Sequence, residues 1–176
     1  TTGSDGVLMI DGLKWGDYYL VETKAPKGYI KSDKKYDFTI SAANDAGQEL
    51  TLKLENEQIP ASVVLTKYEA LEDGTKNPAN IPLDNAGYQL YDSNNNLLGT
   101  YMTDKDGKIY VEDLTFGTYY FKETIAAKGY EKYPNNIYFT IDGNHTDVAL
   151  EVETTDTRLT GQVWMQKVDD IGQYVK

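Results

Sequence analysis

The chain has 176 residues, 40% of them hydrophobic, with a formal net charge of -11 at pH 7 and a pI near 4.5. This length and composition can bury the core of one or two soluble domains. The acidic balance argues against nucleic-acid partners and anionic membranes, which both require basic patches, and the absence of cysteine excludes disulfides and thiolate chemistry. The single histidine, His145, lies in a turn-like run, so we expect neither a metal nor a cofactor.

Short apolar runs dominate the chain, and turn clusters such as DSNNN and DKDG separate them. The fifteen tyrosines are residues that favour strands, and we find no long helical period. No apolar run is long enough to span a bilayer, so we expect no membrane insertion. The sequence therefore predicts an all-β fold.

The first clear strand pattern is YYLVETKAPKGY, from Tyr18 to Tyr29. Successive strand side chains point to opposite faces, which places Glu22 on the same face as Tyr18 and Leu20. A later alternating run ends with Asn56 on its apolar face, after Leu50, Leu52 and Leu54. A glutamate and an asparagine are therefore predicted to face the core of this region.

The next strand pattern, ASVVLTKYEA, begins at Ala61 and places Lys67 on the face of Val63 and Leu65. Downstream, YYFKETIAAKGY repeats the first motif, and its glutamate is Glu123. The last alternating run of this region carries Asp156 on one face together with Val148, Leu150, Val152 and Thr154. Here a lysine, a glutamate and an aspartate all point inward.

An internal repeat organises the chain, because residues 2–40 align without a gap with residues 103–141. A repeat of about a hundred residues indicates tandem domains. Residues 1–60 then correspond to the C-terminal part of a domain whose first strands are missing, and residues 61–160 to a complete domain. Residues 161–176 repeat 61–76 and supply the first strand of a further unit, with Lys167 in the place of Lys67.

The inward polar residues have ordinary interpretations when each is taken alone. A lysine near a strand end can extend to water, a glutamate can pair with it, and an Asp or Asn can cap a turn. Their recurrence at matching positions favours a shared chemical task. Burial favours the neutral forms of amines and carboxyl groups, which are the forms that can condense.

The pattern Y-x-x-E-T-x-A-x-x-G-Y, with a V-x-x-T-K strand upstream, resembles the CnaB-type (prealbumin-like) repeats of Gram-positive surface adhesins and pilins. The resemblance implies tandem Ig-like β-sandwich domains. It also implies an autocatalytic intramolecular isopeptide bond between a first-strand lysine and a last-strand Asn or Asp, assisted by the motif glutamate. By position these residues are Lys67, Asp156 and the catalytic Glu123.

The other units carry the same family motif only in part. Glu22 and Asn56 match the glutamate and the acceptor in the first unit, and Lys167 matches the lysine of a third. Ala127 replaces the proline found at Pro26, and KYPNN only partly resembles the YPK polymerisation motif of pilins, because it lacks the lysine. An alternative for the first unit is a Lys167–Asn56 bond between neighbouring copies, although a segment of a longer chain is the simpler interpretation.

The resemblance implies a structural stalk or shaft module of a Gram-positive adhesin or pilin, with no turnover of an external substrate. Its expected partners are neighbouring repeats of the same protein or fibre. The resemblance also implies a secreted, cell-wall-anchored surface protein or pilus. Because the chain shows no secretory or wall-sorting signal, we expect the anchor to lie outside this segment. The main alternative is an adhesin module that binds host matrix protein or glycan through Trp15, Trp164 and Tyr133. A weaker one is an accessory domain of a secreted glycan-processing enzyme.

Overall fold

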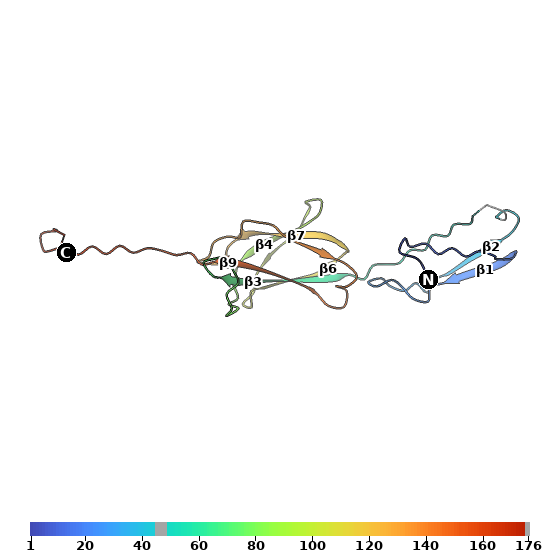
Figure 1. The fold of residues 1–176 in the computed structure, drawn as a ribbon, viewed down its shortest axis with the longest axis horizontal. Helices are drawn as coiled ribbons and strands as arrows, with labels where there is room; N and C mark the ends of the chain where they lie inside the picture. The colour runs from blue at the N-terminus through green and yellow to red at the C-terminus, as the bar shows by residue number, and fades with distance from the viewer. Residues whose placement is uncertain (45–48, 175–176) are drawn as a thin grey trace. The chain divides into compact units, whose positions relative to one another are not determined.

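The computed structural model describes residues 1–44 and 49–174, and its regular elements are all strands (Figure 1). This confirms the predicted all-β class. Within the described residues there is no helix long and apolar enough to cross a membrane. The strands are β1 (Gly16–Val21), β2 (Lys35–Ile40), β3 (Ala61–Ala70), β4 (Gly87–Asp92), β5 (Leu97–Met102), β6 (Lys108–Leu114), β7 (Gly117–Ile125), β8 (Ile137–Ile141) and β9 (Leu150–Thr157).

The chain forms two compact units, Thr1–Ile59 and Pro60–Lys176. In the first, β1 and β2 form an antiparallel pair in which Tyr18 lies opposite Phe38, with their rings stacked at 5.6 Å. Residues 50–56 match β9 in sequence, yet the structure shows no strand there. In the second unit β9 pairs with β3, and residues 1–59 contain no copy of β3 that could pair in this way.

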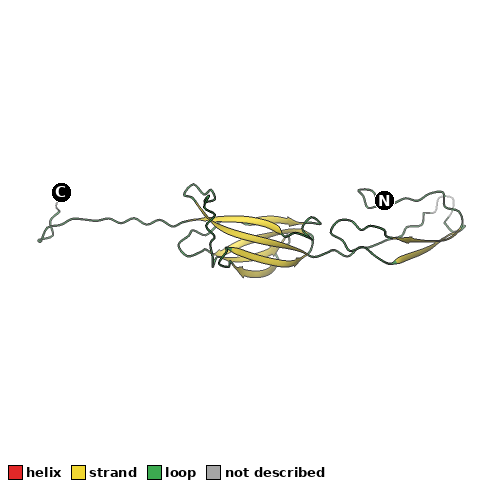
Figure 2. Cartoon of the chain, turned by 90° about the horizontal axis from the view of Figure 1, so that it is seen from below, coloured by secondary structure: helices red, strands yellow, loops and turns green. Residues whose placement is uncertain are grey.

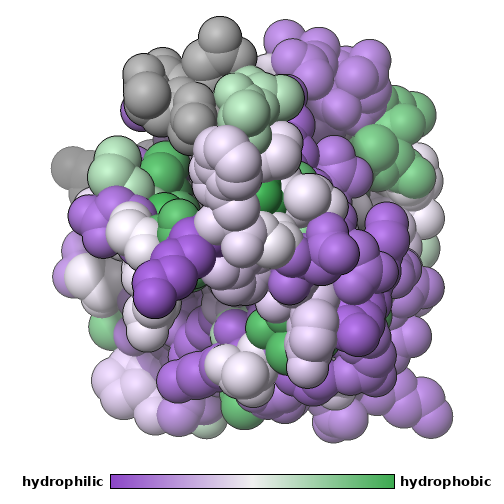
Figure 3. Space-filling model, turned by 90° about the vertical axis from the view of Figure 1, so that its right-hand side faces the viewer, coloured by the Kyte–Doolittle hydropathy of each residue, from purple (hydrophilic) through white to green (hydrophobic). Residues whose placement is uncertain are grey.

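Apolar side chains of the first unit consequently remain exposed. Leu8 is 49% exposed and Ile10 47%, although they match the buried residues Ile109 and Val111 of β6. Leu50 and Leu54, which match core-facing positions of β9, are 44% and 42% exposed. On the face drawn in Figure 3, hydrophilic residues predominate and hydrophobic residues occur in small separate areas.

The second unit is a β-sandwich of two sheets, with strand orders β6-β3-β9 and β5-β4-β7-β8 (Figure 2). β3 lies at the centre of the smaller sheet, antiparallel to β6 and parallel to β9. The core between the sheets contains Val63, Leu65, Leu90, Phe121 and Ile141, all 0–1% exposed. The apolar residues of the alternating sequence pattern thus form the inner face of each sheet.

Aromatic side chains pack on both faces of the larger sheet. On the inner face Phe139 stacks against Phe121 at 5.3 Å and against Tyr119 at 5.7 Å. On the other face Tyr120 contacts Tyr91 at 5.0 Å and Tyr138 at 5.2 Å. Such cross-strand pairs stabilise a sheet, which gives the high tyrosine content a structural role.

Residues 161–174 follow β9 as an exposed segment that carries one isolated bridge, Val168 to Tyr174. Val163, Trp164 and Met165 are 89%, 90% and 94% exposed. The expected first strand of a further unit is not formed here, because an alternating segment becomes a strand only when another strand satisfies its backbone groups.

Gly107 closes the turn between β5 and β6 against the centre of β3. Its φ is +72°, its carbonyl accepts the Lys67 N–H at 2.8 Å, and a Cβ there would lie 2.5 Å from the Lys67 carbonyl oxygen. Gly129 has a similar φ of +89°, but nothing lies within 4 Å of its Cβ position. Of these two glycines, only Gly107 combines a left-handed conformation with a close backbone contact.

We expect Gly107→Ala to destabilise the second unit more than Gly129→Ala does. Both substitutions carry the conformational cost of a positive φ, but only the first forces backbone atoms apart, which adds about 1–3 kcal/mol. Denaturant unfolding followed by circular dichroism measures the difference. Equal losses in the two variants would contradict the close packing of this turn on β3.

Candidate functional site

Lys67 is held in the middle of β3 with its side chain fully buried. Its N–H donates to the carbonyl of Gly107, and its carbonyl accepts the N–H of Leu83 at 3.0 Å. Loops on one side of the strand therefore satisfy the backbone of Lys67. Its position in the strand directs the ammonium group into the space between the two sheets.

The structure brings Lys67, Asp156 and Glu123 together, as alternation predicted. In the parallel register of β3 and β9, Lys67 lies opposite Thr154, and Asp156 follows two residues later on the same face. Lys67 Nζ contacts Asp156 Oδ1 and lies 3.4 Å from the carboxyl oxygens of Glu123. All three side chains are 0% exposed. Glu123 comes from β7, so the cluster joins both sheets.

Two tyrosines surround the lysine amine. Lys67 Nζ lies 5.6 Å from the ring centroids of Tyr88 and Tyr133. Tyr88 is fully buried on β4, directly opposite Glu123 on β7. Tyr133 follows β7, and its N–H donates to Glu123 Oε2. The aromatic rings lower the local polarity around the amine and limit access by water.

Burial dominates the electrostatics of Glu123. Removal from water raises its pKa from 4.5 to about 7, although Lys67 and the N–H of Tyr133 act in the opposite direction. The Asp156 carboxyl adds to the upward shift. Below about pH 7 this glutamate therefore holds a proton that it can donate.

Several buried polar atoms near the amine have no hydrogen-bond partner. Among the described residues these atoms are the Tyr88 hydroxyl, Glu123 Oε1, the Thr154 hydroxyl and Asp156 Oδ2. Buried polar groups are normally paired, so four unpaired atoms in a single cluster are unusual. The polar atoms without partners thus belong to residues of the cluster around Lys67.

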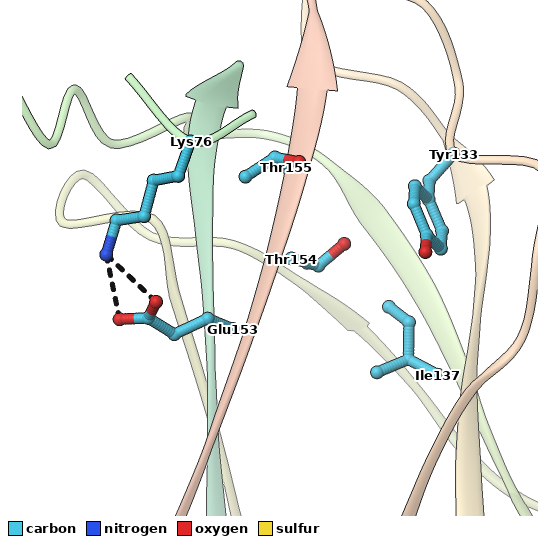
Figure 4. Close-up of a pocket in the computed structure, with 6 residues that line it drawn as sticks. All are labelled: Lys76, Tyr133, Ile137, Glu153, Thr154 and Thr155. Carbon is cyan, nitrogen blue, oxygen red and sulfur yellow. Dashed lines mark hydrogen bonds and ion pairs between the residues drawn. The ribbon is translucent and has the colours of Figure 1, made fainter. Parts of the chain in front are cut away.

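A surface pocket of about 230 Å³ lies beside the cluster, lined by Lys76, Tyr133, Ile137, Glu153, Thr154 and Thr155. Figure 4 shows Thr154 on the side of β9 toward Tyr133 and Ile137, whereas Glu153 points toward Lys76. Solvent therefore reaches the outer side of Thr154 and Tyr133 while the three ionisable side chains stay buried.

The first unit holds the glutamate and the amide of the motif in contact. Asn56 Nδ2 donates to Glu22 Oε2 at 2.7 Å, and the N–H of Ser32 donates to the same oxygen at 2.7 Å. Ser32 is the counterpart of Tyr133, so both units keep a backbone donor on the glutamate. Lys167 lies in the exposed segment after β9.

Sequence reasoning missed Tyr88 and a second polar cluster around Glu69. The Glu69 carboxylate accepts hydrogen bonds from Asn77 at 2.8 Å, Arg158 Nε at 3.2 Å and the Tyr130 hydroxyl. Glu69 lies two residues after Lys67, and Arg158 two after Asp156, so alternation could have placed both on the face of the site.

Among residues 1–44 and 49–174, no three His, Asp or Glu side chains form a group suited to a metal ion.

A family model described as SpaA, a prealbumin-like fold domain, matches residues 1–58 and 72–158. These ranges cover most of the chain. The chain belongs to the SpaA prealbumin-like fold family. This confirms the resemblance and the Ig-like β-sandwich class that the sequence motifs indicated. No curated protein matches the chain.

Two solved structures show the same fold. The Bacillus anthracis TIE protein gives a TM-score of 0.56 at 24% identity, over 90% of this chain and 28% of its own. A C-terminal fragment of the pilus adhesin SpaC from Lactobacillus rhamnosus GG gives a TM-score of 0.50 at 15% identity, over 92% and 83%. The prealbumin-like chain thus spans 28% of the length of the TIE chain.

Glu69→Gln should destabilise the second unit at neutral pH. The hydroxyl of Tyr130, followed by Arg158 and Asn77, lowers the pKa of Glu69 from 4.5 to about 2. A lowered carboxyl pKa stabilises the fold above pH 4.5, and this contribution is lost as the pH falls toward 2. The unfolding midpoints of parent and variant should therefore differ at pH 7 and converge toward pH 2.

The control is Glu153→Gln, which removes an exposed pair with Lys76 at 2.9 Å. Exposed pairs contribute little to stability, so this variant should keep the parent midpoint. A difference for Glu69→Gln that stays constant between pH 7 and pH 2 would show that the ionised carboxylate does not stabilise the fold.

Proposed function

We propose that this chain is a structural module of a surface adhesin or pilus shaft, in which an autocatalytic amide bond joins Lys67 to Asp156. The observation that supports the bond is the contact of Lys67 Nζ with the Asp156 carboxylate, beside Glu123, with all three side chains fully buried. The reaction happens once in each domain. It makes the module a cross-linked structural element and not an enzyme.

The reaction starts with a proton transfer inside the cluster. When a proton of the Lys67 ammonium group passes to the Asp156 carboxylate, a neutral amine and a neutral carboxylic acid remain in contact. Nζ of Lys67 then attacks Cγ of Asp156, while the protonated Glu123 donates its proton to the departing hydroxyl and regains one from the nitrogen. One C–N bond forms, one C–O bond breaks, and water leaves. Fixing the reactants at contact distance lowers the barrier by about 7–11 kcal/mol.

A neutral amide is more favourable in this buried site than the ion pair is, because the amide carries no charge. Buried charges carry a large desolvation penalty, which their mutual attraction offsets only with complete hydrogen bonding. Asp156 Oδ2 has no partner, so the hydrogen bonding of this pair is incomplete. A neutral amide removes both charges and, by the loop-closure relation for a loop of 89 residues, stabilises the fold by about 4–5 kcal/mol.

The same chemistry is proposed for the other units. In the first, Asn56 is the acceptor and Glu22 the catalytic residue, and a lysine on a strand equivalent to β3 completes the site with release of ammonia. Lys167 is the reacting lysine of a unit that begins near Gly161. The partners are then neighbouring repeats of one protein or fibre outside the cell.

The ligand-binding alternative has weaker support. Trp15 and Trp164 are 65% and 90% exposed, as a binding surface would require. The Tyr133 ring, the third expected contact, lies beside the Lys67 amine. Tyr133 thus has a structural role at the buried site, and the proposal of a host matrix protein or glycan is supported only by the exposure of the two tryptophans.

The intact mass of the denatured protein should be lower than the sequence mass by one water. Lys67→Met should restore the full mass, because no amine is left to attack, and Glu123→Gln should slow the reaction because the proton carrier is lost. Lys76→Met is the matched control, since Lys76 pairs with Glu153 on the exposed side of β9. A parent with the full sequence mass would show that the Lys67–Asp156 pair is an ordinary buried ion pair.

The bond should also reduce the contour length that an applied force can extend. β3 and β9 are parallel neighbours, so tension applied at Ala61 and Thr157 passes through the bond and bypasses the chain between its two ends, which are 89 positions apart in sequence. In single-molecule pulling, Lys67→Met should release roughly 300 Å of contour length that the parent retains. Equal extension of parent and variant would contradict a mechanical role for the bond.

A further inference from the structure

The proposed condensation requires hydrogen-bond donors for a new negative charge, and the three reacting residues do not supply them. Attack on Cγ of Asp156 places negative charge on a carboxyl oxygen, and that oxygen becomes the carbonyl of the amide. Before the reaction Oδ1 contacts the lysine amine, whereas Oδ2 has no partner. Donors aimed at such an oxygen are a major source of rate enhancement in acyl transfer.

The donors nearest the reacting atoms are committed elsewhere. The N–H of Tyr133 donates to Glu123 Oε2, and the amine of Lys67 is the nucleophile. In the described part of the chain, the buried side-chain donors without a partner are the hydroxyls of Tyr88 and Thr154. The Tyr88 hydroxyl interacts with Thr154 and Glu123, so both hydroxyls belong to the cluster that contains the reacting groups.

Strand pairing places both hydroxyl-bearing residues beside the reacting cluster. Thr154 precedes Asp156 by two residues on the same face of β9, and it is the register partner of Lys67. Tyr88 lies opposite Glu123 in the other sheet, with its ring 5.6 Å from Lys67 Nζ. Thr154 is 6% exposed and Tyr88 0%. The two residues approach the reacting atoms from opposite sheets.

We propose that the hydroxyls of Tyr88 and Thr154 are the oxyanion donors of this condensation. They donate to the Asp156 oxygen that becomes negative when Nζ attacks, and they keep these bonds to the carbonyl of the finished amide. The proposal rests on the proposed function, since without bond formation there is no oxyanion to bind.

The protonation state of Tyr88 fits a donor. Burial, and then the nearby carboxyl groups of Glu123 and Asp156, raise the pKa of Tyr88 well above its ordinary value of 10. The phenol therefore keeps its proton throughout the pH range in which the domain folds. A threonine hydroxyl does not ionise in that range, so both groups can donate whatever the state of Glu123.

The test compares cross-linking rates in variants that lose a hydroxyl and keep its shape. Parent chain, Tyr88→Phe and Thr154→Val are extracted from inclusion bodies in denaturant, refolded by dilution, and sampled by intact mass for the loss of one water. Each substitution should slow the loss on the order of 10²-fold, as removal of one oxyanion donor does in enzymes that catalyse acyl transfer. Thr154→Ser keeps a hydroxyl and should retain most of the parent rate.

The controls are a tyrosine and a threonine on the opposite faces of the same strands. The Tyr91 hydroxyl donates to Gln89 at 2.8 Å, and Thr155 lies beside Thr154 with its side chain on the other face of β9. Tyr91→Phe and Thr155→Val should cross-link at the parent rate. Tyr88→Phe and Thr154→Val are also introduced into the Lys67→Met variant, which cannot form the bond. Unchanged unfolding midpoints in that background would show that the slower reaction is a chemical effect and not a loss of stability.

The outcomes separate this proposal from the one on which it rests. A parent that loses water, together with Tyr88→Phe and Thr154→Val variants that react at the parent rate, would overturn the oxyanion assignment alone. A parent that never loses water would overturn both. Slow reaction in both variants, parent rates in both controls and unchanged midpoints in the Lys67→Met background would establish the assignment.

Discussion

The second unit depends on one interaction, the enclosure of an ammonium group between two carboxyl groups in an otherwise apolar core. Lys67, Asp156 and Glu123 are completely buried, and they come from three strands in two sheets. Charges in such a place are stable only when their partners are fixed, so the register of β3 on β9 and the facing of the two sheets must both be maintained. The same requirement places the amine against a carbon that it can attack.

The parallel pairing of the first and last strands would give the proposed bond a mechanical role. Lys67 and Asp156 are 89 residues apart in sequence, yet their strands are neighbours. A covalent link there joins the two ends of the domain by a short path. A similar link between sequential strands such as β7 and β8 would enclose little chain and leave most of the domain open to extension.

The alternation of side chains along each strand predicted that the three ionisable residues point inward, because it indicates which face of the sheet a side chain occupies. It could not show that Tyr88 and Thr154 lack partners, since a hydroxyl on an inner face is usually paired. It also suggested strands at residues 50–56 and 163–168, and the structure has none there. Alternation describes one strand at a time, whereas a strand forms only where a partner satisfies its backbone groups, and that partner can lie anywhere in the chain.

The two units together show how the acceptor side of the site is organised. In the first unit Glu22 still accepts hydrogen bonds from the Ser32 N–H and from Asn56, although the structure shows no strand at residues 50–56. The glutamate and the acceptor therefore meet without a lysine between them. The segment after the motif strand holds the glutamate through a backbone donor, as Tyr133 does for Glu123. If the proposed condensation takes place, a lysine strand that joins such a site would meet a proton carrier already in contact with the group to be attacked, so the order of assembly would favour reaction as soon as the strand is in place.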